Sequence, residues 1–181
     1  MALKPTIYKV DLSLSDMDRH RYQQQRLTLA LHPSETEERL LVRLLAFADR
    51  YGEGIEFTRG ISQTDEPDVW QHSLDGVLQQ WIEVGQPDGD RVISAARKAK
   101  RVVVYAYGSS CRVWQQKQAA KLGSLRNLEL CVVPYEPLQA LLKGLSRNCE
   151  CSVMISDGEW MVTLGDASEQ LSPEWLQRSE G

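Results

Sequence analysis

The sequence predicts an α/β protein in which helices flank a mixed sheet, and three features indicate this fold class. Residues 3–14 and 20–31 mix apolar and polar side chains as strands do, and a polar turn at 15–18 joins them into a β-hairpin. Residues 34–51 carry apolar side chains at helical spacing. Residues 102–107 form an unbroken apolar strand, which is typical of a parallel pair buried on both faces.

The first helix is predicted from a start signal and an apolar stripe. His32 and Pro33 end the preceding strand, and Ser34 with Glu37 matches a capping box. The stripe that follows contains Leu40, Leu41, Leu44, Leu45 and Ala48. This pattern predicts a helix over residues 34–51.

The central part of the chain alternates strands with helices. Residues 55–58 predict a short strand, and an acidic loop follows before Gly76 turns the chain into a strand over 77–85. Asp88 or Asp90 then caps a helix that runs to about residue 100. The predicted order from the first helix is therefore helix, strand, strand or turn, strand, helix, strand.

The remaining predicted elements are shorter. A helix at 111–121, a strand at 128–133 and a helix at 137–144 lead to a hairpin, CSVMIS and EWMVTL, that turns at Asp157-Gly158. Residues beyond Ala167 are predicted to form a loosely attached tail. Because it has no internal repeat and no long linker, the sequence predicts a single domain over residues 1–181.

Composition places the chain among ordinary globular proteins. Of its 181 residues, 42% are hydrophobic and 25% are charged, which argues against disorder. No segment approaches the roughly 20 apolar residues of a membrane span, and the N-terminus lacks the apolar core of a signal peptide. We therefore expect a cytoplasmic protein with no membrane partner. The sequence does not predict an oligomeric state.

The overall charge limits the nucleic-acid binding that can be expected. A net charge of −4 argues against strong nonspecific DNA binding, because that affinity comes mainly from neutralising phosphates. A nucleic-acid partner would need a local basic patch. The candidates for such a patch are Arg39, Arg43, Arg91, Arg97, Lys98, Lys100 and Arg101.

Glu83 is the most unusual residue of the chain, because it interrupts an otherwise apolar strand segment at residues 81–84. Burying an ionised carboxylate is unfavourable unless a positive or hydrogen-bonding group meets it. On a strand, Trp81, Glu83 and Gly85 share one face. Glu38 lies at the edge of the apolar stripe of the first helix, so its carboxylate could reach the same cavity.

These carboxylates predict a site for a divalent cation. Glu38 and Glu83, together with Asp68 or Asp75, would form a set of oxygen ligands suited to Mg²⁺. The corresponding chemistry is hydrolysis of a phosphodiester, in which the ion polarises the phosphoryl group and lowers the pKa of the attacking water.

The positive group of such a site must come from outside the strand. Gly85 stands two residues after Glu83, where a nuclease strand would present a lysine. The next helix offers Lys98 or Arg91 to stabilise the developing negative charge.

A structural interpretation of Glu83 needs no metal. In it, the carboxylate forms a buried ion pair with Arg59 or Arg91, and the acidic loop is simply solvated. Structural ion pairs also produce unusual carboxylates, so residue types alone leave both interpretations open.

Several motifs, in this order and at these spacings, resemble one known family. They are MALKPTIYKVDLSLSDMDR at the N-terminus, then LHPSETEERLLVRLLAF, FTRGIS, DEPDVW and WIEVGQPD. Together they extend over essentially the full chain, which is similar to the YaeQ family of small bacterial proteins.

The resemblance implies an α/β fold that varies the PD-(D/E)xK core of restriction-endonuclease-like proteins, with added β-hairpins. It places one carboxylate at Glu38, acids at residues 65–68 and another at Glu83. It also implies an acid, in many members, where this chain has Gln79. The family implies no settled activity, and a fold alone does not fix a function.

Two functions are consistent with these observations. The first is a Mg²⁺-dependent nuclease or related phosphodiesterase that uses the carboxylates and basic residues named above. The second is a catalytically degenerate nuclease fold that binds nucleic acid or a protein partner. The second hypothesis predicts a charge-neutralised site, for example one in which Glu83 is bonded directly to an arginine.

Overall fold

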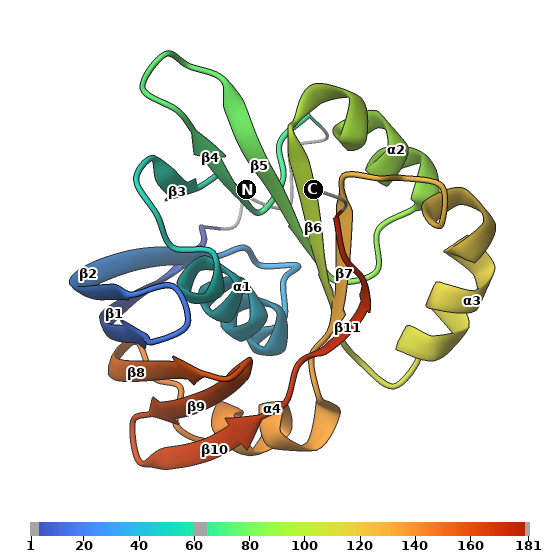
Figure 1. The fold of residues 1–181 in the computed structure, drawn as a ribbon. Helices are drawn as coiled ribbons and strands as arrows, with labels where there is room; N and C mark the ends of the chain where they lie inside the picture. Colours follow the sequence, from blue (N-terminus) through green and yellow to red (C-terminus); the bar gives the residue numbers. More distant parts are fainter. Residues whose placement is uncertain (1–3, 60–64, 180–181) are drawn as a thin grey trace. The chain divides into compact units, whose positions relative to one another are not determined.

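The computed structural model describes residues 4–59 and 65–179 of the chain. Within these residues it contains four helices and eleven strands, and the strands form one five-stranded and one six-stranded sheet (Figure 1). The predicted mixed α/β class is confirmed. The chain forms two compact units: unit 1 comprises residues 1–51 and 134–173, and unit 2 comprises residues 52–133 and 174–181.

Unit 1 is built on the predicted N-terminal hairpin. β1 (Thr6–Asp16) pairs antiparallel with β2 (Arg21–Leu31) and parallel with β8 (Asn148–Ser156). β9 (Glu159–Leu164) and β10 (Ala167–Leu171) extend the sheet, which has the order β10-β9-β8-β1-β2. The parallel β1–β8 pair therefore joins the N-terminal hairpin to the second predicted hairpin, formed by β8 and β9.

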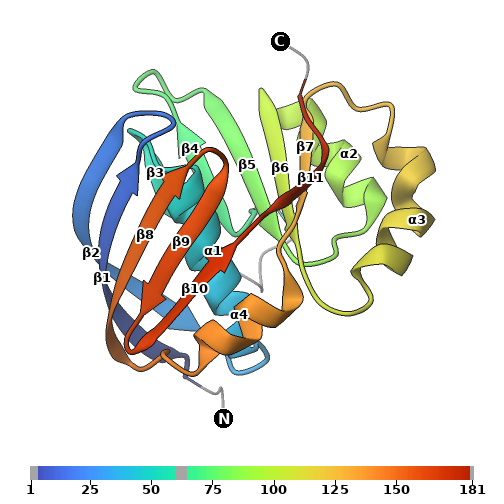
Figure 2. The ribbon, with the colours of Figure 1, turned by 60° about the horizontal axis from the view of Figure 1, so that its bottom comes forward.

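The sheet of unit 1 has one buried and one exposed face, because side chains alternate along each strand. On β1, Val10 and Leu12 are at most 1% exposed, while Asp11 between them faces solvent. The helices α1 (Glu37–Asp49) and α4 (Tyr135–Leu142) pack against the strands of this unit, as Figure 2 shows.

The N-terminus of α1 differs from the predicted capping box. The hydroxyl of Thr36 caps the helix by accepting a hydrogen bond of 3.1 Å from the backbone N–H of Arg39. The Ser34 hydroxyl instead lies 2.7 Å from the imidazole of His32. The predicted cap is wrong by two positions, because Thr36 is the residue with the extended backbone that an N-cap requires.

Unit 2 contains the parallel strands. β5 (Leu78–Val84), β6 (Arg101–Ala106) and β7 (Leu128–Val132) are neighbours and run parallel, which confirms the pairing predicted for residues 102–107. β3 (Ile55–Phe57) and β11 (Glu174–Gln177) lie at the edges of the sheet, whose order is β11-β7-β6-β5-β4-β3.

The sixth strand, β4 (Val69–His72), lies inside the predicted acidic loop. It pairs antiparallel with β5, and Val69 faces Ile82 across the pair. Both side chains are 0% exposed, so burial of Val69 stabilises this strand. The acidic residues that precede Val69 made the sequence predict a loop here instead.

One face of the sheet in unit 2 is covered by α2 (Gly89–Lys98) and α3 (Cys111–Leu122) (Figure 1). Asp88 caps α2 by accepting a hydrogen bond from the backbone N–H of Asp90. The core between helices and sheet includes Trp81, Val92, Ala95, Val104, Trp114 and Leu128. None of the helices in the described parts of the chain combines the length and apolar character needed to cross a membrane.

The predicted loose tail beyond Ala167 is wrong. β10 pairs with β9, and β11 pairs with β7, so both C-terminal segments belong to sheets. Leu171 is 0% exposed, and the ring of Trp175 packs edge-on against Tyr105 at 5.9 Å between centroids. Burial of these few apolar residues orders a segment that is otherwise polar.

Replacing Leu171 with alanine tests whether the C-terminal segment is part of the core. We expect Leu171→Ala to lower the free energy of unfolding by about 2–4 kcal/mol, because it leaves a cavity in a buried site. The exposed neighbour substitution Gln170→Ala is the control and should change stability by less than about 0.5 kcal/mol. Urea unfolding measures both, and equal effects would show that residues after Ala167 contribute no specific packing.

Candidate functional site

The hairpin of β4 and β5 brings two of the predicted acids together in unit 2. The backbone N–H of Asp68 donates to the carbonyl of Ile82 at 3.1 Å, which places Asp68 beside Glu83. Its carboxylate Oδ2 accepts a hydrogen bond of 2.8 Å from the backbone N–H of Val84. Asp68 is 2% exposed and Glu83 is 5% exposed, so the site is a pair of buried carboxylates.

Glu83 is bonded directly to an arginine. The Nε and Nη2 atoms of Arg91 each lie 2.9 Å from Oε1 of Glu83. The indole Nε1 of Trp81 donates to the same oxygen at 2.8 Å, as the shared strand face of Trp81 and Glu83 predicts. Of the two arginines considered from the sequence, Arg91 therefore makes the ion pair.

The pKa of Glu83 is raised above its ordinary value. The largest cause is burial, which disfavours the charged form, and the neighbouring charge of Asp68 acts in the same direction. Arg91 and the indole of Trp81 oppose this rise by stabilising the carboxylate. The ionised form of Glu83 therefore depends on Arg91 for stabilisation.

Arg91 also connects the site to the acidic loop. It lies in the first turn of α2, three positions after the Asp88 cap, and its Nη2 donates to the backbone carbonyl of Glu66 at 2.7 Å. Arg91 and Lys98 share one face of α2, because they are seven positions apart. The Arg91 guanidinium lies 5.8 Å and the Lys98 ammonium 5.6 Å from the centre of the Trp81 ring.

Asp75 does not lie at this site. It is exposed in the turn between β4 and β5, where it accepts a hydrogen bond from the Ser73 hydroxyl, and this bond lowers the pKa of Asp75. From Leu78, where β5 leaves the turn, to Glu83 the strand spans about 16 Å. Of the two alternatives, Asp68 is therefore the acid that accompanies Glu83.

Glu38 lies in unit 1, in the first turn of α1, whereas Asp68, Glu83, Arg91 and Lys98 all lie in unit 2. A metal site shared by Glu38 and Glu83 remains a prediction. Within the ranges 4–59 and 65–179, no three histidine, cysteine, aspartate or glutamate side chains are grouped closely enough to hold a metal ion. The acids that do lie together fit Mg²⁺ only as a two-carboxylate site, and Arg91 already neutralises one of them.

The predicted basic residues divide between the units. Arg43 of unit 1 is 3% exposed and contacts Glu35, so it cannot take part in a surface patch. Arg97, Lys98, Lys100 and Arg101 lie where α2 ends and β6 begins in unit 2. Arg126 joins them just before β7, because Leu128 pairs with Val102.

We call Arg97, Lys98, Lys100, Arg101 and Arg126 the basic edge. Arg126 was not predicted from the sequence, because only the parallel pairing of β6 and β7 places it at this edge. Arg97, Lys98 and Lys100 are exposed, and none of the three forms an ion pair with a carboxylate in the described residues. Their charges therefore remain available to a ligand.

Comparison by sequence connects the chain to one protein family. The family profile described as "YaeQ protein" matches residues 1–173. A protein of Salmonella typhi described as "Uncharacterized protein YaeQ" is 37% identical over 183 residues, which cover 99% of this chain and 100% of that protein. A protein of Escherichia coli K12 with the same description is 36% identical over the same coverage.

Solved structures of two similar proteins have the same fold. The crystal structure of the YaeQ protein from Pseudomonas syringae matches with a TM-score of 0.92 and 43% identity, covering 98% of each chain. That of the YaeQ protein from Xanthomonas axonopodis pv. citri matches with a TM-score of 0.90 and 40% identity, covering 96% of this chain and 98% of the other.

The raised pKa of Glu83 gives a prediction for stability against pH. Because the folded-state pKa exceeds the unfolded value, near 4.5, the folded protein binds this proton more tightly. Stability from this group is present below pH 4.5 and is lost as the pH rises from 4.5 through the folded pKa. Glu83→Gln removes the titration, so wild type should lose stability relative to this variant over that window.

Urea unfolding of both proteins between pH 4 and pH 8 measures this difference. The exposed substitution Glu150→Gln is a control for general charge effects and should give no such trend. A wild-type stability that rises relative to Glu83→Gln over the window would mean that Arg91 outweighs burial at this carboxylate.

Proposed function

The chain belongs to the YaeQ family, and we propose that it is a nuclease-fold module that binds nucleic acid without cleaving it. The observation that carries this proposal is the direct bond between Glu83 and Arg91. Such a bond is the charge-neutralised arrangement that the degenerate-site hypothesis predicts.

The relationship to the PD-(D/E)xK core is part of the proposal. Asp68 follows a proline and precedes β4, and Glu83 stands on the adjacent strand β5. This is the order in which the nuclease motif presents its acids, and Gly85 replaces the lysine that would follow. The parallel strands β5, β6 and β7 with α2 and α3 on one face are consistent with this core.

The contacts of Glu83 work against metal binding. A cation that approached Oε1 would have to displace the guanidinium of Arg91 and the indole N–H of Trp81. One carboxylate oxygen of Asp68 is also occupied, because it accepts a hydrogen bond from the backbone N–H of Val84. Losing these contacts would leave a half-buried arginine and a buried strand N–H with fewer partners, which is unfavourable.

The basic edge is the surface that would bind the nucleic acid. Its charges come from the end of one helix and the starts of two adjacent strands, so they are concentrated although the whole chain is acidic. Lysine and arginine at such spacing neutralise phosphates and release counterions, which gives sequence-independent, salt-dependent affinity. Phosphate contacts carry no sequence information, so we expect little sequence preference.

Reversing one charge of the basic edge tests the binding function. Lys100→Glu should weaken binding of a labelled single-stranded RNA or a duplex DNA on the order of tenfold at low salt, and it should reduce the salt slope by about one. Lys117→Glu makes the same change at an exposed position of α3 and serves as the matched control. Fluorescence anisotropy measures both, and wild-type protein that binds neither nucleic acid at low salt would contradict the proposal.

A second candidate is a Mg²⁺-dependent nuclease or phosphodiesterase, favoured by the adjacency of Asp68 and Glu83. Asp68 and Glu83 would hold the ion, which would polarise a phosphoryl oxygen and lower the pKa of the attacking water. Arg91 or Lys98 would then offset negative charge on the phosphorus. This candidate requires Arg91 to leave Oε1 of Glu83 when the ion binds.

Magnesium titration separates the two functions, because Trp81 bonds directly to Glu83 and reports on it by fluorescence. If the chain is the proposed binding module, Mg²⁺ should not change the fluorescence of Trp81, which is the signal that Trp81→Phe removes. Mg²⁺ should also not support cleavage of nucleic acid. Arg91→Gln should create such a fluorescence response if the arginine excludes the ion. Cleavage by wild type that requires Mg²⁺ and is lost in Glu83→Gln would instead establish the nuclease.

A further inference from the structure

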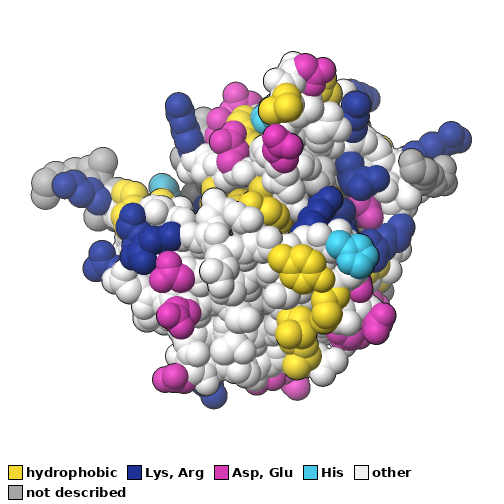
Figure 3. Space-filling view, turned by 60° about the vertical axis from the view of Figure 1, so that its left-hand side comes forward, with side chains coloured by type: hydrophobic (Ala, Val, Ile, Leu, Met, Phe, Trp, Pro, Cys, Tyr) yellow, Lys and Arg dark blue, Asp and Glu magenta, His cyan; other side chains and the backbone are white. Residues whose placement is uncertain are grey.

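The exposed face of the sheet in unit 1 carries a groove with unusual lining. Figure 3 shows this side of the molecule: uncoloured side chains and backbone fill its middle, hydrophobic side chains gather toward one side, and charged ones stand toward the rim. A hollow of about 540 Å³ lies over β1, β2, β8 and β9. An exposed sheet face is usually a solvated surface, so the presence of this hollow and the residues that line it need an explanation.

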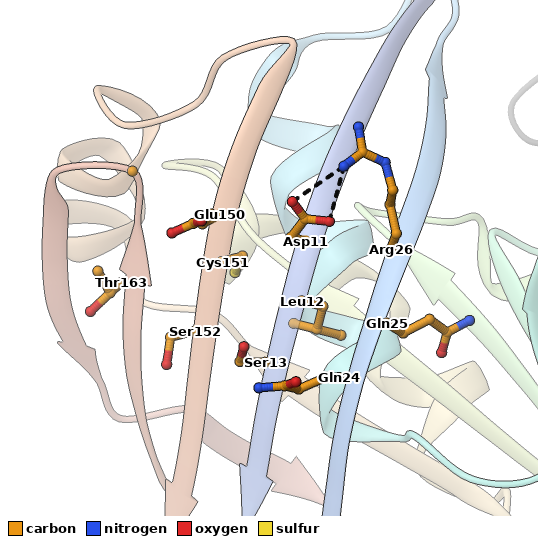
Figure 4. Close-up of a pocket in the computed structure, with 11 residues that line it drawn as sticks. Asp11, Leu12, Ser13, Gln24, Gln25, Arg26, Glu150, Cys151, Ser152 and Thr163 are labelled. Atoms are coloured by element: carbon orange, nitrogen blue, oxygen red, sulfur yellow. Dashed lines mark hydrogen bonds and ion pairs between the residues drawn. The ribbon is translucent and has the colours of Figure 1, made fainter.

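The register of the strands explains the depth. Ser13 of β1 pairs with Gln24 of β2 on one side and with Ser152 of β8 on the other, and Ser152 pairs with Thr163 of β9. The short side chains of Ser13 and Ser152 thus lie in the middle of the hollow, and the longer Gln24 and Arg26 line it from β2 (Figure 4). The hollow follows from this alternation of short and long residues across the sheet.

The groove continues along the strands. A second hollow of about 400 Å³ shares Asp11, Arg26, Glu150 and Gly165 with the first and extends to Asn148. Both hollows lie over the paired strands β1 and β8, so together they form one groove along these strands. From Asn148 to Ser152 the floor extends about 13 Å, which suits an elongated ligand rather than a single small ion.

The charges of the groove are nearly balanced. Asp11 and Arg26 form an ion pair at 3.2 Å across β1 and β2, visible in Figure 4. Glu150 is exposed beside them, and no side chain in the described residues forms an ion pair or hydrogen bond with its carboxylate. Lys9 and Asp166 at the second hollow add one charge of each sign, so the lining disfavours polyanions, and its uncharged part consists mainly of hydroxyl and amide groups.

An apolar row borders the groove at one end. Tyr22, Met154 and Met161 lie in one line across the sheet through the pairs Tyr22–Ser15, Ser15–Met154 and Met154–Met161. Their exposed fractions of 61%, 44% and 47% are large for such side chains. Tyrosine and methionine at a rim can pack against an apolar ring face while the hydroxyl of the tyrosine stays in water.

We propose that this groove binds a short neutral oligosaccharide. Each sugar ring offers hydroxyl groups that both donate and accept hydrogen bonds, which matches Ser13, Ser152, Thr163 and the amide of Gln24. The carboxylate of Glu150 accepts from two neighbouring sugar hydroxyls, and such charge-assisted bonds are the stronger kind. The C–H face of a ring at the end of the chain packs against Tyr22.

The site is tested by screening the full chain against an immobilised panel of neutral glucose, galactose, mannose and N-acetylglucosamine oligosaccharides. Hits are then titrated by calorimetry, with spermidine and inorganic phosphate as charged alternatives. Saturable binding of a neutral oligosaccharide is expected. Binding of spermidine or phosphate alone, or of no member of the panel, would overturn the proposal.

Two substitutions locate the binding. Ser152→Tyr fills the floor of the groove at an exposed strand position that tolerates tyrosine, and it should abolish saccharide binding. Ala30→Tyr is the control at an exposed position of β2 that lines neither hollow, and it should leave binding unchanged. Glu150→Gln should weaken binding roughly tenfold while urea unfolding stays as in wild type. Saccharide binding that survives Ser152→Tyr would place the ligand elsewhere and disprove the assignment.

Discussion

The ion pair between Glu83 and Arg91 is the contact on which the architecture of unit 2 depends. A carboxylate that is 5% exposed needs a counter-charge, since leaving one partner of a buried pair uncompensated costs about 3–5 kcal/mol. That cost is a large part of the roughly 5–15 kcal/mol by which a domain is stable. The cap at Asp88 fixes the start of α2 and thereby brings Arg91 to the strand. The contact thus links the first turn of α2 to β5, beside the apolar core that includes Trp81, Val92 and Ala95.

The same contact limits the chemistry of the site. Oε1 of Glu83 already accepts hydrogen bonds from Arg91 and Trp81, so a metal ion that used this oxygen would have to displace both donors. A nuclease lysine at position 85 would leave this oxygen available and add a positive charge from the strand itself, whereas Gly85 adds none. In this chain, the positive charge approaches from the helix and bonds to the acid directly. The contact that stabilises β5 therefore also makes the carboxylate of Glu83 less available to a metal ion.

The sequence predicts the parts of this site that follow local rules. The alternation of side chains along a strand places Trp81 and Glu83 on one face, and the cap signal places Arg91 in the first turn of the next helix. It cannot distinguish Asp68 from Asp75, because both are acids in one loop and only the pairing of Val69 with Ile82 separates them. The tail beyond Ala167 is mispredicted for a related reason: its strands are short, and their order comes from partners far away in the sequence. The placement of Glu38 with respect to Glu83 depends on two units, which no local pattern fixes.

Charge distribution explains how an acidic chain can present surfaces with different ligand preferences. The net charge of −4 describes the whole chain, but screening limits each charge to about 8 Å at physiological ionic strength. At that range, the electrostatic force on a phosphate near the basic edge comes from Arg97, Lys98 and Lys100 and not from the net charge of the chain. The excess of acidic residues lies mainly in unit 1, where the groove presents Glu150 and a paired Asp11. A polyanion is therefore attracted to the edge of one sheet and repelled from the face of the other, so the two proposed ligands do not compete for one surface.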